Sequence, residues 1–270
     1  MVKGVEAIMP IINDHPSENH PFAESLLSND ESSTNGVSHR CLLENGSHDV
    51  FLDYMTLALQ DHHISPEALE RRRDLIKTLQ IKDAPMPVSP FPKNTTTQKG
   101  NFAEVFLAEY LCTTTEAELP IYRLRYNPNV EQSMKGDDVL LFDLDSDPVR
   151  IIVGESKFRG VPDKKAVVDI VEGLVRSNRT GLPISLMFVA ERLFEAGNSE
   201  LAKKVQNCAV LFLTNQLQID YIGFLMSNYK AKKIVNTHAS SELHNLLMIS
   251  LNFESPDTIV QQAFARLEGR

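Results

Sequence analysis

The length, composition and charge of the chain exclude several classes of protein. It has 270 residues, of which 42% are hydrophobic and 23% charged, and these proportions are typical of a soluble globular protein. No apolar run approaches the roughly 20 residues that a membrane helix needs. The formal net charge of −9 argues against capture of nucleic acid by bulk electrostatics alone. We therefore expect a globular protein without membrane segments, in which any nucleic-acid site is local.

The cysteines and the first residues of the chain indicate the compartment. Cys41, Cys112 and Cys208 are far apart and odd in number, so the sequence predicts neither a disulfide framework nor a paired-cysteine zinc site. The first 20 residues hold one lysine, an apolar patch interrupted by proline and then acids. A signal peptide has a basic head and an unbroken apolar centre instead. The expected location is the cytoplasm.

Residues 1–92 are expected to form an N-terminal region that is partly irregular and partly helical. Residues 1 to about 50 are rich in Ser, Asn, Asp, Glu, His and Pro, with few large hydrophobes to offset the entropy of ordering. Two helices are predicted next, over 49–63 and 65–82, the second with Ser65 as its N-cap. Together they suggest a small helical N-terminal unit.

Residues 93–270 are expected to form an α/β domain. Four prolines between Pro85 and Pro92 mark the boundary, because such a segment holds neither a helix nor a central strand. Strands alternate with helices beyond it, which indicates an α/β fold. The predicted helices cover 100–111, 164–178, a broken stretch 192–207 and a last segment from 255; the predicted strands cover 119–127, 138–143, 149–158, 183–190, 209–215 and an edge strand 245–253.

Two charged side chains interrupt the strand predicted over 149–158. Because side chains alternate along a strand, Glu155 and Lys157 project from one face about 6 to 7 Å apart. The rest of both faces is largely apolar, which is typical of a strand that other elements cover on each side. An unpaired ion in such a place is costly. Both charges are therefore expected to meet partners or a metal ion.

Two further carboxylates are expected near this pair. If 138–143 and 149–158 form a hairpin, Asp138 at the start of one strand lies beside Glu155 at the end of the other. In the helix over 100–111, Glu104 points along an apolar stripe. Three converging acids and one lysine predict a site for a hard divalent cation, Mg²⁺ or Mn²⁺. Such a site suits hydrolysis of a phosphodiester bond, with the lysine orienting the attacking water.

This ordered set of residues resembles the PD-(D/E)xK nuclease superfamily. An acid precedes a strand, an acid-x-Lys triplet ends the next strand, and a glutamate lies on the preceding helix. The resemblance implies a nuclease-like mixed sheet flanked by helices. It also implies that Asp138, Glu155, Lys157 and Glu104 are catalytic, and that Asp138, Glu155, Glu104 and the Ser156 carbonyl hold the metal.

A narrower resemblance covers about residues 100–179. The segments KGNFAEVFLAEYL, YRLRYN, KGDDVLLFD and GESKFRG occur in this order and resemble HamA, the family of nuclease subunits in the bacterial Hachiman anti-phage defence systems. This resemblance implies a metal-dependent DNA endonuclease. It further implies a heterodimer with a HamB-like superfamily 2 helicase, in which the nuclease is the effector subunit. The alternative is a catalytically inactive nuclease-fold subunit that binds DNA or regulates a partner helicase.

Several charged residues have more than one interpretation. The superfamily has a proline before the acid, where this chain has Gly136 and Asp137. Asp137 is predicted to be a turn residue rather than a ligand. Basic residues flank the helix over 164–178 and are expected to form a solvated face more often than a DNA contact: Lys164, Lys165, Arg176 and Arg179. His62 and His63 lack the spacing of a zinc site, and surface positions are the favoured interpretation.

Overall fold

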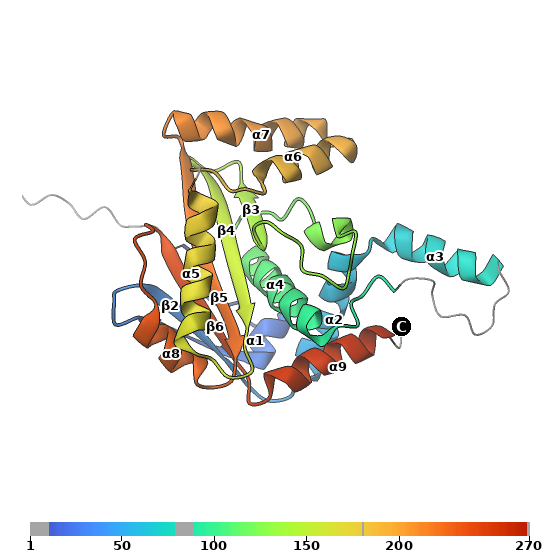
Figure 1. Ribbon diagram of the computed structural model, residues 1–270, viewed down its shortest axis with the longest axis horizontal. Helices are drawn as coiled ribbons and strands as arrows, with labels where there is room; N and C mark the ends of the chain where they lie inside the picture. The colour runs from blue at the N-terminus through green and yellow to red at the C-terminus, as the bar shows by residue number, and fades with distance from the viewer. Residues whose placement is uncertain (1–10, 79–88, 180, 269–270) are drawn as a thin grey trace, which may run out of the picture.

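The computed structural model describes residues 11–78, 89–179 and 181–268, and one six-stranded sheet lies at its centre (Figure 1). Its strands are β1 (Leu26–Ser32), β2 (Ser38–Glu44), β3 (Val139–Asp143), β4 (Val149–Phe158), β5 (Leu217–Ser227) and β6 (Leu246–Asn252). Their order across the sheet is β1-β2-β6-β5-β4-β3. The four inner strands run parallel, whereas β1 and β3 pair antiparallel at the two edges. The expected α/β fold with a mixed, nuclease-like sheet is confirmed.

Helices cover both faces of the sheet. One core packs between the sheet and α1 (Pro21–Ser25), α2 (Asp49–His63), α4 (Thr95–Thr114) and α9 (Pro256–Glu268). The other lies against α5 (Lys164–Asn178), α6 (Leu186–Glu195), α7 (Ser199–Leu213) and α8 (Ala231–His238). Helix α3 (Pro66–Thr78) extends away from the body, whereas α6 and α7 lie beyond one end of the sheet (Figure 1). This layering buries β4 and β5 on both sides.

The hairpin and the helix that carry the candidate residues form as expected. Strands β3 and β4 pair antiparallel, with Val139 opposite Gly154. Helix α4 begins after Asn94, whose side chain accepts hydrogen bonds from the first turn, and it packs closely over β4. A Cβ at Gly154 would come 2.9 Å from a methyl carbon of Leu107, so a side chain at position 154 would push the helix away. The lack of a side chain there lets α4 approach the hairpin.

The prediction that the first 50 residues are mostly irregular is wrong for residues 26–44. Strands β1 and β2 form a hairpin there, and β2 pairs in parallel with β6. The hairpin is rich in polar residues because β1 is an edge strand, which has a neighbour on one side only. Segments on both sides of the predicted boundary at residue 92 therefore share one sheet. Of the four prolines that mark the predicted boundary, Pro85 and Pro87 lie outside the described residues.

Three strands predicted after residue 115 are wrong. Glu118 pairs with Phe142 in a single bridge, and the chain then forms the 3₁₀ turn η1 (Arg123–Tyr126) instead of a strand. Residues 183–190 and 209–215 belong mostly to α6 and α7. A short apolar run does not distinguish a strand from a helix by its periodicity. These helices bury one apolar stripe each and expose the other side.

Strand β5 was not predicted from the sequence, and β6 was predicted at the wrong place in the sheet. Strand β5 begins with Gln218 and Asp220 among its hydrophobes, and these polar residues hid it. The strand predicted over 245–253 exists, but β6 lies inside the sheet between β2 and β5 rather than at an edge. The central position follows from the pairing with β2, which the sequence did not reveal. None of the helices in the described ranges combines the length and apolar character that crossing a bilayer requires.

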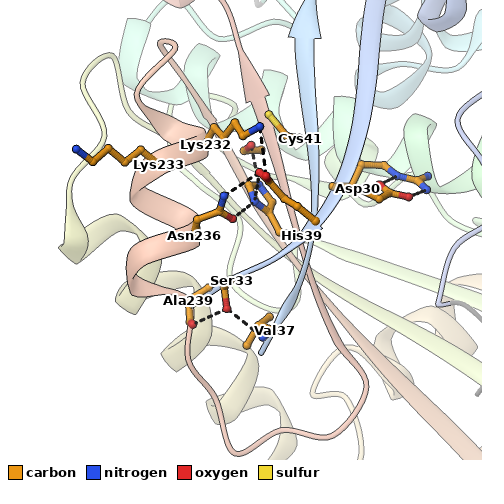
Figure 2. A network of polar contacts seen from close by, with 12 residues as sticks. Asp30, Ser33, Val37, His39, Cys41, Lys232, Lys233, Asn236 and Ala239 are labelled. Carbon is orange, nitrogen blue, oxygen red and sulfur yellow. Dashed lines mark hydrogen bonds and ion pairs between the residues drawn. The ribbon is translucent and has the colours of Figure 1, made fainter. Parts of the chain in front are cut away.

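A buried polar network joins α8 to the sheet (Figure 2). The His39 side chain is fully buried; its Nδ1 lies 2.6 Å from Asn236 Oδ1 and its Nε2 lies 2.8 Å from Ser250 Oγ. The amide oxygen only accepts, so Nδ1 carries the proton and Nε2 accepts from the serine. Asn236 also donates to Glu31 at 2.8 Å. The network therefore stabilises a neutral imidazole.

We expect His39→Leu to lower the free energy of unfolding by about 2 kcal/mol at pH 7.5, because it removes the donor to the Asn236 amide oxygen and the acceptor of the Ser250 hydroxyl. Burial lowers the pKa of His39. Its contribution to the free energy of unfolding is therefore complete above the pKa of the unfolded chain, near 6.5, and is lost as the pH falls through the lower pKa of the folded chain. Urea unfolding at pH 7.5 and 5.5 tests both effects. The exposed His244→Leu is the control, and equal pH dependence of wild type and His39→Leu would contradict the assignment.

Candidate functional site

The predicted site lies where α4, β3 and β4 meet. A cavity of about 670 Å³ opens there, and its lining includes Glu104, Arg123, Asp138, Ser156 and Lys157. The glutamate comes from the middle of α4, Asp138 directly precedes β3, and the other two predicted residues belong to the last part of β4. Residues that are more than 50 positions apart in sequence thus line one cavity.

Asp138 is fixed by the end of β4. Its Oδ2 accepts hydrogen bonds from the backbone nitrogen of Ser156 at 2.8 Å and from the Ser156 hydroxyl at 2.9 Å. Since Val139 pairs with Gly154, the antiparallel register places Asp138 next to Glu155. The hairpin therefore brings these two acids together, as its sequence predicts. Their roles in catalysis and metal binding stay predictions.

Glu155 and Lys157 form an ion pair on the α5 side of β4. Lys157 Nζ lies 2.5 Å from Glu155 Oε1. The carboxylate packs against Gly173 of α5, where a Cβ would come 2.6 Å from Glu155 Cδ. Burial raises the pKa of Glu155, and the neighbouring Asp138 raises it further, whereas Lys157 lowers it. The charge of this glutamate is thus sensitive to the cations around it.

Glu104 is buried under the same cavity. Only 6% of the residue is exposed, in agreement with its place on the apolar stripe of α4. Burial raises the pKa of Glu104 to about 8, with Arg123 opposing this effect and Asp138 and Glu155 adding to it. The two acidic neighbours act through space, so the three carboxylates form one electrostatic unit. A second cation near Glu104 would favour its ionised form.

Arg123 is part of the site, although it was not predicted from the sequence. Its Nε lies 2.9 Å from Glu104 Oε1, and its Nη2 lies 3.9 Å from Asp138 Oδ1. Arg123 belongs to η1, in a segment that the sequence predicts to be a strand. Nothing in its spacing to the acids indicates the contact. The 3₁₀ turn and the loop after it bring the guanidinium to the acids.

Asp137 holds the loop before β3, which is consistent with the predicted turn role. It is buried, with 4% of the residue exposed. Its carboxylate accepts from the Ser177 hydroxyl of α5 at 2.5 Å and from the Ser185 backbone nitrogen before α6 at 2.9 Å. Its carbonyl oxygen accepts from Arg123. Asp137 therefore links the two helices to the arginine rather than facing the cavity as a ligand.

The donor atoms fit a hard divalent cation, although the carboxylates already have cationic partners. Glu104, Asp138 and Glu155 supply the oxygen ligands that Mg²⁺ and Mn²⁺ prefer, and the neighbouring acids help to raise the pKa of Glu104 and of Glu155. Within residues 11–78, 89–179 and 181–268, no three acid, histidine or cysteine side chains are grouped closely enough to hold a metal ion. Metal binding at this site therefore requires the carboxylates and cations to rearrange.

Other candidate residues have structural partners. His62 and His63 are buried, so the preference for surface positions is wrong. His62 Nε2 lies 2.8 Å from Glu109, and His63 Nδ1 donates to the Leu59 carbonyl at 2.7 Å. Arg176 lies 3.9 Å from Glu172, both of them exposed on α5, as an i,i+4 pair should.

Similarity to known proteins extends over most of the chain. The model of the HamA family matches residues 19–267. The chain belongs to the HamA family. A curated relative, the Hachiman protein HamA of Bacillus cereus, is 34% identical over 258 residues, and the match covers 94% of this chain and 93% of that protein. The predicted resemblance is confirmed, and the HamA match also includes β1, β2 and the other helices outside residues 100–179.

Proposed function

We propose that this HamA-family chain is a divalent-metal-dependent nuclease that hydrolyses phosphodiester bonds of DNA. The observation that carries the proposal is the meeting of Asp138, Glu155 and Lys157 at the end of one hairpin, over the buried Glu104. Asp138, Glu155, Glu104 and the Ser156 carbonyl would hold Mg²⁺ or Mn²⁺. A bound metal ion would neutralise a phosphate oxygen and make bound water more acidic. Lys157 would orient the attacking water.

The cavity has further groups that suit a phosphate backbone. Lys99, Lys135 and Arg159 line it together with the first turn of α4. Lys99 forms an ion pair with Asp257 and lies 5.3 Å from the centre of the Phe158 ring. These cations supply local positive charge on a chain whose net charge is −9. Local charge of this kind supports a confined DNA site better than nonspecific binding over the whole surface.

The relative from Bacillus cereus is named a Hachiman protein, and we infer that this chain works in the same kind of system. It would be the effector subunit of an anti-phage complex, with a HamB-like superfamily 2 helicase as its partner. Supercoiled and linear DNA should be incubated with the chain in Mg²⁺ or Mn²⁺, with and without ATP and a HamB-like helicase. We expect cleavage that depends on the metal and increases when the helicase is present.

A catalytically inactive binding subunit is the second candidate. The observation that favours it is that each buried acid already has a cation beside it: Arg123 at Glu104, and Lys157 at Glu155. Such pairs would suit a site that is purely structural. If the wild-type chain, alone and with its helicase, cuts no DNA form in any divalent metal yet still binds the helicase or DNA, this candidate replaces the nuclease.

Gly173→Ala is expected to lower DNA cleavage at least about tenfold with little change in the melting temperature. The new Cβ would come 2.6 Å from Glu155 Cδ, and a shift of the carboxylate by about 1 Å misplaces a reacting group. The exchange itself favours a helix interior by about 1 kcal/mol. Gly100→Ala in α4 is the matched control, because its Cβ would meet nothing within 4 Å. Equal cleavage by both variants would contradict a role for Glu155.

A further inference from the structure

Arg123 is held from two sides against the acidic site. Its side chain is 13% exposed. Nη2 donates to the Met134 carbonyl at 2.8 Å, and Nη1 donates to the Asp137 carbonyl. Nε and Nη2 face Glu104 and Asp138 at 2.9 Å and 3.9 Å. Two backbone acceptors and two carboxylates thus define the position of one guanidinium.

We propose that Arg123 is a built-in counter-cation that competes with a divalent metal ion for Glu104 and Asp138. The inference rests on the proposed metal-dependent nuclease and adds a residue that sets how tightly its acidic site binds metal. A metal ion bound by these carboxylates would lie within a few ångströms of a guanidinium that remains charged at any physiological pH. Because the site is largely buried, water screens this repulsion poorly. Metal binding therefore requires the arginine to withdraw.

The backbone around residue 137 determines how easily the arginine withdraws. Asp137 bonds to Ser177 of α5 and to Ser185 before α6, while its carbonyl oxygen accepts from Arg123. Gly136 has a positive φ of 119°, and a Cβ there would come 2.7 Å from Ser185 Oγ. The loop is therefore packed tightly against the start of α6. Withdrawal of the guanidinium should loosen the backbone at residues 134–137.

Titration with Mn²⁺, followed by the electron paramagnetic resonance signal of the free ion, tests the competition directly. Arg123→Gln should bind Mn²⁺ at least about tenfold more tightly than the wild-type chain, since it removes the competing charge. Arg125→Gln is the matched control on the same turn. Arg125 donates to the Asp61 carbonyl at 2.7 Å and stacks on Tyr122 at 4.4 Å. The Mn²⁺ affinity of Arg125→Gln should stay within about twofold of wild type, because the Arg125 guanidinium faces Asp61 and Tyr122 rather than the acidic site.

The outcomes separate this inference from the proposed function. Unchanged or weaker Mn²⁺ binding by folded Arg123→Gln, with binding that still requires Glu155, overturns the competition and leaves the nuclease site in place. If neither the wild-type chain nor any folded variant binds Mn²⁺, the proposed metal site is contradicted, and the proposed competition is contradicted with it. A second measurement needs no variant: amide hydrogen exchange at residues 134–137 of the wild-type chain should speed up when Mn²⁺ binds. Unchanged or slower exchange in the metal-bound chain would overturn the competition.

Discussion

Glu155→Gln is expected to reduce cleavage of DNA in Mg²⁺ or Mn²⁺ by at least about a hundredfold. The amide keeps the shape of the side chain but removes the negative charge, and with it a ligand for the metal. Stability should change little, because burial raises the pKa of Glu155 and the neutral side chain suits its surroundings. Cleavage of supercoiled and linear DNA, with the helicase and ATP present, measures the loss. Circular dichroism shows whether the fold is kept.

Lys157→Met should cause a loss of similar size, since Lys157 Nζ lies 2.5 Å from Glu155 and both groups serve one reaction step. The double variant should lose little more than either single one, because residues that act as a unit are not additive. The exposed pair of Lys203 and Glu200 on α7, 2.9 Å apart, supplies matched control variants, Lys203→Met and Glu200→Gln. Full activity in both Glu155→Gln and Lys157→Met would rule out the site.

Arg150→Met is expected to lower the free energy of unfolding by about 3 to 5 kcal/mol. The Asp220 side chain is fully buried and pairs with Arg150 Nε. Arg150 also donates to the Ile11 carbonyl. Without the guanidinium, the carboxylate stays buried, and its remaining side-chain partner among the described residues is Gln218, whose Nε2 lies 3.1 Å away. This pair joins the first residues of β4 to those of β5, two neighbouring parallel strands, so the loss weakens the contact between them. Urea unfolding followed by circular dichroism measures it.

Arg176→Met is the matched control for this buried pair. Arg176 and Glu172 are 3.9 Å apart, with side chains 57% and 62% exposed, so its loss should cost less than about 0.5 kcal/mol. Adding Asp220→Leu to Arg150→Met should restore much of the stability, since an apolar pair leaves no charge uncompensated. A cost below about 1 kcal/mol for Arg150→Met alone would show that Asp220 is stabilised in another way.

The elements that the sequence predicts best are those whose patterns need no distant partner. Helices α2, α4, α5 and α9 have clear stripes or caps, and the hairpin of β3 and β4 has a turn between two apolar runs. Strand β5 was not predicted because an aspartate is rare in a buried strand, and its partner Arg150 is not apparent from the sequence. Strand β1 was not predicted because the composition of a polar edge strand is similar to that of a loop. The error at β5 concerns a residue whose partner lies 70 positions away in the chain.

The candidate site follows the same division. Alternation along β4 places Glu155 and Lys157 on one face, and the hairpin places Asp138 beside them, so local geometry predicts these three. The apolar stripe on α4 predicts that the Glu104 side chain is buried. Which residues it meets depends on the packing of α4 over Gly154. Arg123 has no such signal. Its contact with Glu104 depends on the loop that Asp137 fastens to two helices.

The sequence by itself determined the α/β class, the hairpin and the identity of the four residues proposed for catalysis, because alternation and helical periodicity act over a few residues. The tertiary structure alone decided that the first strands complete the main sheet, that β6 lies inside it, and that cations lie beside the buried acids. The reason is physical. Pairing of distant strands and of buried charges depends on which surfaces come into contact in the folded chain. A pattern of residues that are neighbours in the sequence does not specify these contacts.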